Sequence, residues 1–121
     1  VDAPIGRKDA STIERQIDYK KGERAVTHYK KIDTKNGYTL LSIVLETGRT
    51  HQIRVHMSSI GYPLIGDFLY HPDSNELPRQ ALHSHKLEFF HPITNEKMTF
   101  LTPMPSDMQD FWNSLSNKAE I

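Results

Sequence analysis

The sequence contains no cysteine, has no net charge and has no long apolar run. The absence of cysteine from its 121 residues excludes disulfide bonds, thiolate nucleophiles and cysteine-ligated metal sites. Fifteen lysine and arginine residues balance fifteen aspartate and glutamate residues, so the bulk charge gives no indication of a nucleic-acid partner. No apolar segment reaches the length of a membrane span. What remains is a chain long enough for one domain at most, with an apolar share of 36% that is slightly low for a globular protein.

The alternation of apolar and polar residues predicts several strands and turns. Strands are expected at residues 25–32, 38–46, 81–90 and 97–101. Asn36-Gly37 is a strong hairpin signal between the first two strands, because both residues tolerate positive φ. The segment 11–19 has only two apolar anchors and is compatible with a short helix capped by Ser11, with irregular structure or with a strand. With two helices, these elements predict an α+β fold that contains an antiparallel or mixed sheet of four or five strands.

Two stretches have the periodicity of helices. The first is expected to follow Thr50 as its N-cap and to end at Gly61, with an apolar stripe of Ile53, Met57 and Ile60. The second is expected over residues 107–115, after Ser106 as its N-cap. Its inner face is predicted to consist of Met108, Phe111, Trp112 and Leu115.

The turn at residues 47–52, between a strand and a helix, is the best candidate for a site. Gly48 lets the chain leave the strand sharply, and the first N–H groups of the helix are suited to binding an anion. Arg54 lies at the edge of the apolar stripe and therefore needs an anionic partner. That partner is either a structural carboxylate or part of a functional site. Because Arg49, Arg54, a cap and a glycine converge on one helix start, the second interpretation is favoured, with Arg49 free to contact a ligand.

The seven histidines do not predict a metal site. His51 and His56 are five residues apart, which is the wrong spacing for two ligands on one face of a helix. His83 and His85 share a strand face, but no third ligand is apparent nearby.

A basic run in the first half of the chain has two interpretations. It comprises Lys20, Lys21, Arg24, Lys30, Lys31 and Lys35. Such a run can follow a phosphate backbone. Because Asp18, Glu23 and Asp33 interrupt it, a solvated hairpin surface explains it equally well.

Several segments of the chain resemble motifs of the RluA-type pseudouridine synthases. Residues 45–56, LETGRTHQIRVH, resemble the third motif of that family, and residues 61–67, GYPLIGD, resemble the segment after it, with Tyr62 in place of a histidine. Further resemblances lie at residues 4–7 (PIGR), 25–29 (AVTHY), 79–84 (RQALHS) and 87–92 (LEFFHP). The resemblance covers nearly the whole chain, and motifs in this order are a specific signal.

The resemblance implies an enzyme that isomerises uridine in structured RNA, ribosomal or transfer, without metal or cofactor. Arg54 matches the family arginine that pairs with the catalytic aspartate, and Arg49, Thr50, His51 and Gln52 would line the same cleft. The family carries its aspartate in a G-R-L-D motif, which this sequence lacks. We therefore expect residues 1–121 to be the C-terminal portion of a catalytic domain and to be inactive alone.

The same resemblance leads to expectations about location and partners. A cytoplasmic protein is expected, and self-association is expected through the face left open by the missing half. Two other functions remain open. One is a non-catalytic RNA-binding module, and the other is a purely structural half without affinity of its own.

Overall fold

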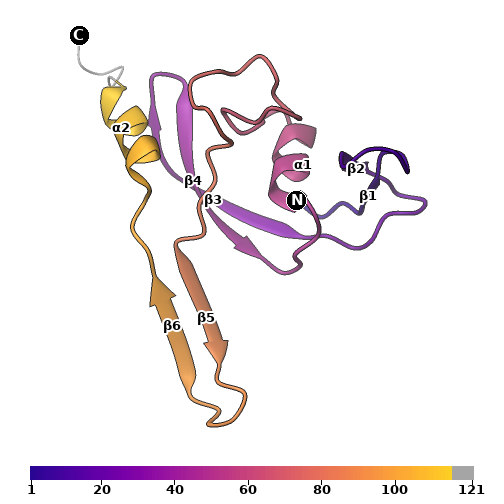
Figure 1. Ribbon diagram of the computed structural model, residues 1–121, viewed down its shortest axis with the longest axis vertical. Helices are drawn as coiled ribbons and strands as arrows, with labels where there is room; N and C mark the ends of the chain where they lie inside the picture. The colour runs from indigo at the N-terminus through magenta and orange to yellow at the C-terminus, as the bar shows by residue number, and fades with distance from the viewer. Residues whose placement is uncertain (116–121) are drawn as a thin grey trace.

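The computed structural model describes residues 1–115 and shows an α+β fold, as predicted (Figure 1). Residues 116–121, which the expected domain includes, lie outside the described part. The elements are β1 (Ile5–Arg7), β2 (Arg15–Ile17), β3 (Thr27–Lys35), β4 (Tyr38–Leu45), α1 (Gln52–Ser59), β5 (Lys86–Phe90), β6 (Lys97–Leu101) and α2 (Ser106–Ser114). Neither helix within residues 1–115 is long and apolar enough to cross a membrane.

The strands form three antiparallel sheets of two strands each, where one sheet of four or five strands was expected. β1 pairs with β2, β3 with β4, and β5 with β6. Two isolated bridges, Asp2 to Val26 and Ile5 to Glu23, connect the N-terminal segment with the chain around the start of β3, and the Val1 amino group donates to the carbonyl oxygen of Thr27. α1 lies between the first two sheets, whereas β5 and β6 project away from them (Figure 1). The helix therefore contacts both sheets, through β2 on one side and β3 on the other.

The central hairpin confirms the predicted turn. Asn36 and Gly37 have φ values of 48° and 83°, and β3 and β4 pair around them with an irregularity between Lys31 and Asp33. The segment 11–19 is irregular except for the short strand β2, in which Ile17 stands opposite Ile5 of β1. A helix is not favoured, because Ile13 is 61% exposed and contributes no apolar face.

β5 begins at Lys86, five residues later than predicted. The Arg79 guanidinium donates hydrogen bonds to the carbonyl oxygens of Gln80 (3.1 Å) and Leu82 (3.4 Å). The partner strand β6 ends at Leu101, which stands opposite Lys86, so residues 81–85 lie beyond the end of the ladder. β6 has the predicted bounds.

The second helix makes its contacts through Phe111 and Trp112 of the predicted inner face, but both of its ends differ from the prediction: it ends at Ser114, and Leu115 lies beyond it in an extended conformation. Pro105 is its N-cap and Ser106 is its first residue, without a capping hydrogen bond from a side chain, so the prediction of Ser106 as N-cap is wrong. Phe111 packs edge-to-face against Tyr38 with the ring centroids 5.2 Å apart. The Lys35 ammonium lies 5.0 Å from the centre of the Trp112 ring. These contacts attach α2 to the tip of the β3–β4 hairpin.

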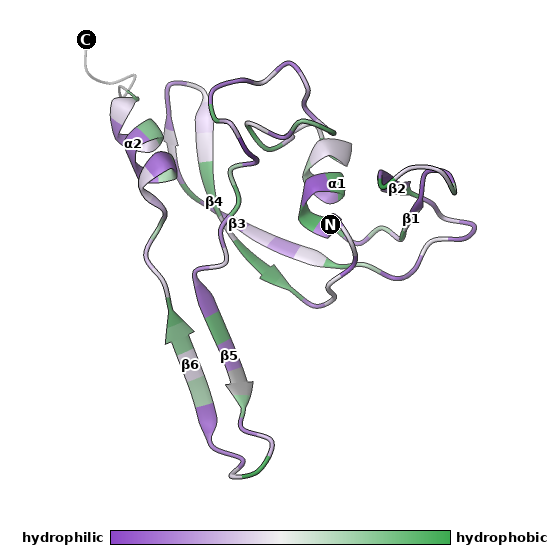
Figure 2. Ribbon diagram, viewed as in Figure 1, coloured by the Kyte–Doolittle hydropathy of each residue, from purple (hydrophilic) through white to green (hydrophobic). Residues whose placement is uncertain are grey.

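The buried core is small and surrounds α1. Ile5, Ala25 and Val55 form its centre, and Ile17 and Tyr70 pack against them. The predicted stripe of Ile53, Met57 and Ile60 is wrong except at Met57, since Ile53 is half-buried and Ile60 is 36% exposed. Large apolar side chains remain exposed on the projecting hairpin of β5 and β6 (Figure 2). They are Leu87, Phe90, Ile93, Phe100 and Leu101.

Candidate functional site

The turn before α1 bends at His51. This residue is the N-cap of α1 and has a left-handed backbone, with φ of 56°, and no side chain caps the helix. The prediction of Thr50 as N-cap is therefore wrong, and the sharp bend expected at Gly48 occurs at His51. The reason lies in Gln52, whose side-chain oxygen accepts the Arg49 N–H at 3.0 Å and organises the turn from inside.

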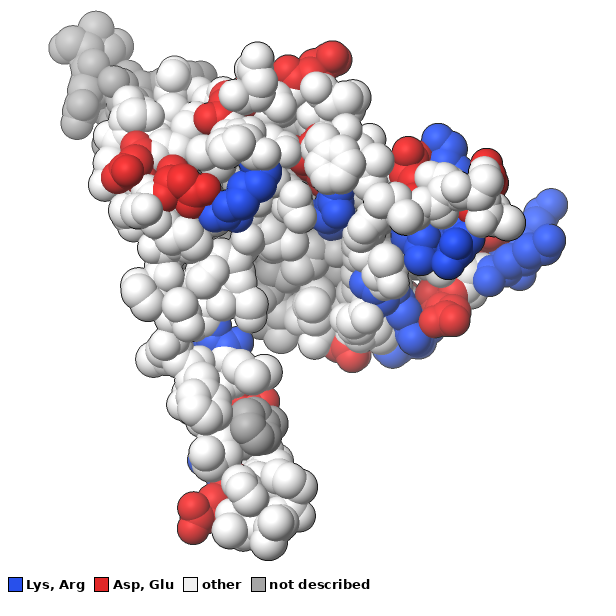
Figure 3. Space-filling view, in the orientation of Figure 1, with Lys and Arg blue, Asp and Glu red and all other residues white. Residues whose placement is uncertain are grey.

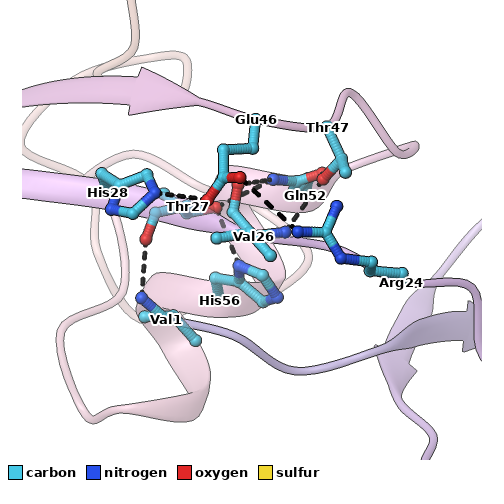
Figure 4. A network of polar contacts seen from close by, with 9 residues as sticks. All are labelled: Val1, Arg24, Val26, Thr27, His28, Glu46, Thr47, Gln52 and His56. Atoms are coloured by element: carbon cyan, nitrogen blue, oxygen red, sulfur yellow. Dashed lines mark hydrogen bonds and ion pairs between the residues drawn. The ribbon is translucent and has the colours of Figure 1, made fainter.

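Gln52 connects the turn to the start of β3 (Figure 4). Its side-chain oxygen also accepts a hydrogen bond from the Thr47 hydroxyl at 2.7 Å. Its amide nitrogen donates to the carbonyl oxygen of Val26 and to the hydroxyl of Thr27, both at 3.0 Å. Because the side chain is only 3% exposed, each of these bonds forms away from water.

Replacing Gln52 by leucine is expected to lower the free energy of unfolding by about 1–3 kcal/mol, because it leaves buried donors and acceptors without partners. Urea denaturation followed by circular dichroism measures this change. The control is Gln109, which lies on an exposed face of α2. Gln109→Leu should change the free energy of unfolding little. Equal effects at both positions would contradict the role of Gln52.

The same network fixes the tautomer of the fully buried His56. Its Nε2 lies 2.8 Å from the carbonyl oxygen of Ala3 and must donate to it. Its Nδ1 then accepts from the Thr27 hydroxyl, also at 2.8 Å. Burial lowers the pKa of His56, which agrees with a neutral imidazole. His56 therefore serves to attach α1 to the N-terminal segment.

Arg54 forms a buried ion pair with Asp67. Its Nε and Nη2 each donate to a different oxygen of the carboxylate at 2.9 Å. Arg54 is 7% exposed and Asp67 is fully buried. Burial alone would raise the pKa of Asp67, but the bonds from Arg54 and from the Tyr70 and Leu69 N–H groups outweigh it and lower the pKa. Among the described residues, the partner of Arg54 is therefore a structural carboxylate, that of Asp67. The pairing of Arg54 with a catalytic aspartate stays a prediction.

Two aromatic rings lie against the Arg54 guanidinium. The ring centres of Phe68 and Tyr70 are 5.5 and 5.2 Å from its central carbon. Asp67 occupies Nε and Nη2, so Nη1 has no hydrogen-bond partner within residues 1–115. The rings and the ion pair together hold the guanidinium in one orientation and leave one of its edges available.

His51 is held by Tyr70. The Tyr70 hydroxyl accepts the Arg15 N–H at 2.8 Å and lies 2.8 Å from Nδ1 of His51. In the neutral imidazole, either the Tyr70 hydroxyl donates to Nδ1 and the ring proton lies on Nε2, or Nδ1–H donates to the hydroxyl oxygen. Burial, followed by the charges of Arg54 and Arg15, lowers the pKa of His51 and favours this neutral form.

Arg49 is less free than the sequence suggested. Its Nε donates to the carbonyl oxygen of Arg24 at 2.8 Å, and its Nη1 lies 2.9 Å from a carboxylate oxygen of Glu23. The side chain nevertheless keeps 39% of its surface exposed, so it is positioned and still accessible.

A hollow of about 280 Å³ brings most of the predicted site residues together. Its walls are Leu45, Arg49, His51, Gln52, Ile53, Arg54, Gln80 and Leu82. Thr50 lies instead in a neighbouring hollow. The size is close to the lower limit of about 300 Å³ for ligand pockets. The hollow combines apolar walls with a fixed cation and polar groups, which suits a planar polar ring.

Reasoning from the residues did not find Gln80 and Leu82, nor the roles of Asp67 and Tyr70. Gln80 and Leu82 belong to the RQALHS segment, whose resemblance to the family motif was the one signal available. Nothing in that segment indicated that an irregular chain would carry it to the helix start.

Known proteins resemble this chain over most of its length. Residues 1–59 match the family described as RNA pseudouridylate synthase. The uncharacterized RNA pseudouridine synthase YjbO of Bacillus subtilis is 53% identical over 108 residues, which cover 89% of this chain and 38% of that protein. Ribosomal large subunit pseudouridine synthase D of Zymomonas mobilis is 44% identical, and the match covers 90% of this chain and 38% of that protein. The protein of the same name from Pseudomonas aeruginosa is 41% identical, and the match covers 88% of this chain and 38% of that protein.

The chain thus spans 38% of the length of each of these relatives. The matches agree with the motifs around the helix start, which carry the residues of the hollow. The chain belongs to the RluA-type family of RNA pseudouridine synthases.

Proposed function

We propose that this chain supplies one wall of the active site of an enzyme that converts uridine to pseudouridine in structured RNA. The observation that carries the proposal is the Arg54 guanidinium, which Asp67 and two aromatic rings hold in place beside the hollow. Large-subunit ribosomal RNA is the first substrate class to test, because it appears in the names of several relatives. Transfer RNA is the second.

The reaction needs a carboxylate nucleophile near the fixed cation. In the proposed mechanism the carboxylate of an aspartate attacks C1′ of the nucleoside and displaces uracil, so the bond from C1′ to N1 breaks as the bond to the carboxylate forms. The base rotates, and C5 then attacks C1′ and displaces the aspartate. The C5 proton is lost and N1 gains one, so the reaction is an isomerisation that regenerates the free carboxylate. Arg54 keeps the nucleophile ionised and oriented, because a nearby positive charge lowers the pKa of a carboxylic acid.

The target uridine leaves its stack to reach the hollow. Leu45, Ile53 and Leu82 provide apolar contacts for the uracil ring. Gln80 and His51 are the polar groups suited to its carbonyl and N–H edges, since Nε2 of a neutral His51 donates or accepts according to the tautomer.

The proposal includes a statement on the isolated polypeptide. No G-R-L-D motif occurs in the 121 residues, and we propose that this polypeptide alone does not catalyse the reaction. A non-catalytic RNA-binding module is the second candidate function, favoured by the same missing motif. A cytoplasmic location and self-association through the exposed apolar side chains remain predictions.

Deleting the gene is expected to remove pseudouridine from at least one position in cellular RNA, mapped by carbodiimide modification and primer extension. The expressed full-length gene product should restore it, whereas residues 1–121 alone should not. Unchanged pseudouridine at every mapped position of ribosomal and transfer RNA would contradict the enzyme. Restoration by residues 1–121 alone would contradict their inactivity.

A further inference from the structure

A second hollow, of about 400 Å³, lies on the other side of Arg49. Three segments form it: β1 and β2, the turn that follows β2, and the turn before α1. Its walls are Ile5, Gly6, Arg7, Arg15, Lys21, Glu23, Gly48, Arg49 and Thr50. The two hollows share Arg49, so they are neighbours on the surface.

Cations dominate this second hollow in a chain that has no net charge. It contains Arg7, Arg15, Lys21 and Arg49 against one carboxylate, that of Glu23, which lies 2.9 Å from Arg49. Figure 3 shows several lysine and arginine side chains over the part of the molecule that carries β1 and β2, with acidic side chains among them. The excess of cations belongs to the wall of the hollow itself, and the balanced composition does not reveal it.

Three of these four cations form no salt bridge within residues 1–115: Arg7, Arg15 and Lys21. The carboxylate of Asp18 lies close to Gly6, and its Oδ1 accepts the backbone N–H groups of Lys20 and Lys21, each at 3.0 Å. Its charge also attracts the Lys21 ammonium, so Lys21 is partly compensated. With Glu23 and Asp18 against four cations, the concave surface keeps an excess of positive charge that attracts anions.

The backbone beside the cations is accessible. A Cβ atom added at Gly48 would meet no atom within 4 Å, so a ligand can approach the chain closely there. Cations spread over three segments suit an extended polyanion better than a single small anion, which needs convergent donors.

We propose that this second hollow, the cationic groove, binds the phosphodiester backbone of the RNA strand whose uridine enters the first hollow. This inference rests on the proposed function and deepens it. Arg49, at the boundary, contacts the phosphate next to the flipped nucleotide, and Arg7 and Lys21 contact the backbone beyond it. Of the basic run in the sequence, the groove thus uses Lys21, while Lys30 and Lys31 lie on the exposed surface of β3.

The test compares two double variants of the full-length gene product that lose the same charge. Arg7→Gln with Lys21→Gln removes two groove cations that form no salt bridge, and Lys30→Gln with Lys31→Gln removes two outside the groove. Binding to an unmodified transcript of large-subunit ribosomal RNA is measured by fluorescence anisotropy at several salt concentrations. Pseudouridine formation in the same transcript is measured in parallel.

The groove variant is expected to reduce the slope of log affinity against log salt by about 1.5, since each lost phosphate contact removes about 0.7–0.9. KM should rise with kcat nearly unchanged, because such contacts bind substrate and transition state alike. The hairpin variant should retain the wild-type slope.

Equal slopes for the two variants, or a larger loss in the hairpin variant, would overturn the groove while pseudouridine formation by the wild type still supports the enzyme. A wild-type protein that binds the transcript through the groove without modifying any RNA would instead count against the enzyme and leave the groove supported. Absence of both binding and modification would overturn both.

Discussion

Replacing Asp67 by alanine is expected to lower the free energy of unfolding by about 3–5 kcal/mol, the usual cost of breaking a buried ion pair. The variant leaves the Arg54 guanidinium, which is 7% exposed, without a counter-charge. It also removes the acceptor for the backbone N–H groups of Leu69 and Tyr70, both at 3.1 Å. Urea denaturation followed by circular dichroism provides the measurement.

Two further variants separate charge from hydrogen bonding. Asp67→Asn retains an acceptor for the loop and should be less damaging than alanine. Combining it with Arg54→Met removes the unpaired cation and should recover at least half of the loss, because removing both partners of a buried pair is often nearly neutral. A double variant as unstable as Asp67→Ala would show that the unpaired charge is not the cause.

Replacing Arg54 by lysine is expected to lower the kcat of pseudouridine formation by about 100-fold or more, the scale seen when a preorganised electrostatic group is lost. Lysine can still pair with Asp67, but its compact ammonium does not present a second fixed edge to a nucleophile. The measurement uses the full-length gene product and follows tritium release from RNA labelled at C5 of uridine.

Measurements of stability and RNA affinity show whether the lower kcat of the lysine variant comes from the chemical step or from unfolding or weaker binding. The lysine variant should bind the transcript as tightly as the wild type and remain folded in the absence of urea, although its urea midpoint should be lower because one of the two bonds to Asp67 is lost. The combination of Arg54→Met with Asp67→Asn should be folded and inactive. Activity within threefold of the wild type in a folded lysine variant would show that Arg54 only supports the fold.

Local signals in the sequence predicted much of the fold. Asn36-Gly37 predicted the central hairpin because the preference for positive φ is a property of the residues themselves. Periodicity likewise placed Phe111 and Trp112 on the side of α2 that contacts β3 and β4. The start of β5 could not be predicted, because it depends on where the partner strand ends in the folded chain, with Leu101 opposite Lys86.

In the candidate site as well, residues within one segment were predicted and partners from distant segments were not. The LETGRTHQIRVH segment located the helix start and named Arg49, His51, Gln52 and Arg54, which the structure brings to one hollow. The buried partner of Arg54 was not predicted, since Asp67 is thirteen residues away and periodicity does not extend across the intervening loop. Likewise, the buried face of α1 contains Gln52 and His56. A search for apolar periodicity does not find these two residues, because their side chains are polar.

The hairpin of β5 and β6 extends away from the packed body, and this separation affects how the protein opens (Figure 1). A lone two-stranded hairpin is only marginally stable in water. Its amide protons should therefore exchange with solvent through local opening, whereas those of α1 should require global unfolding. The protein then has two cooperative units, and a ligand that orders the hairpin would change its exchange without changing the stability of the helix.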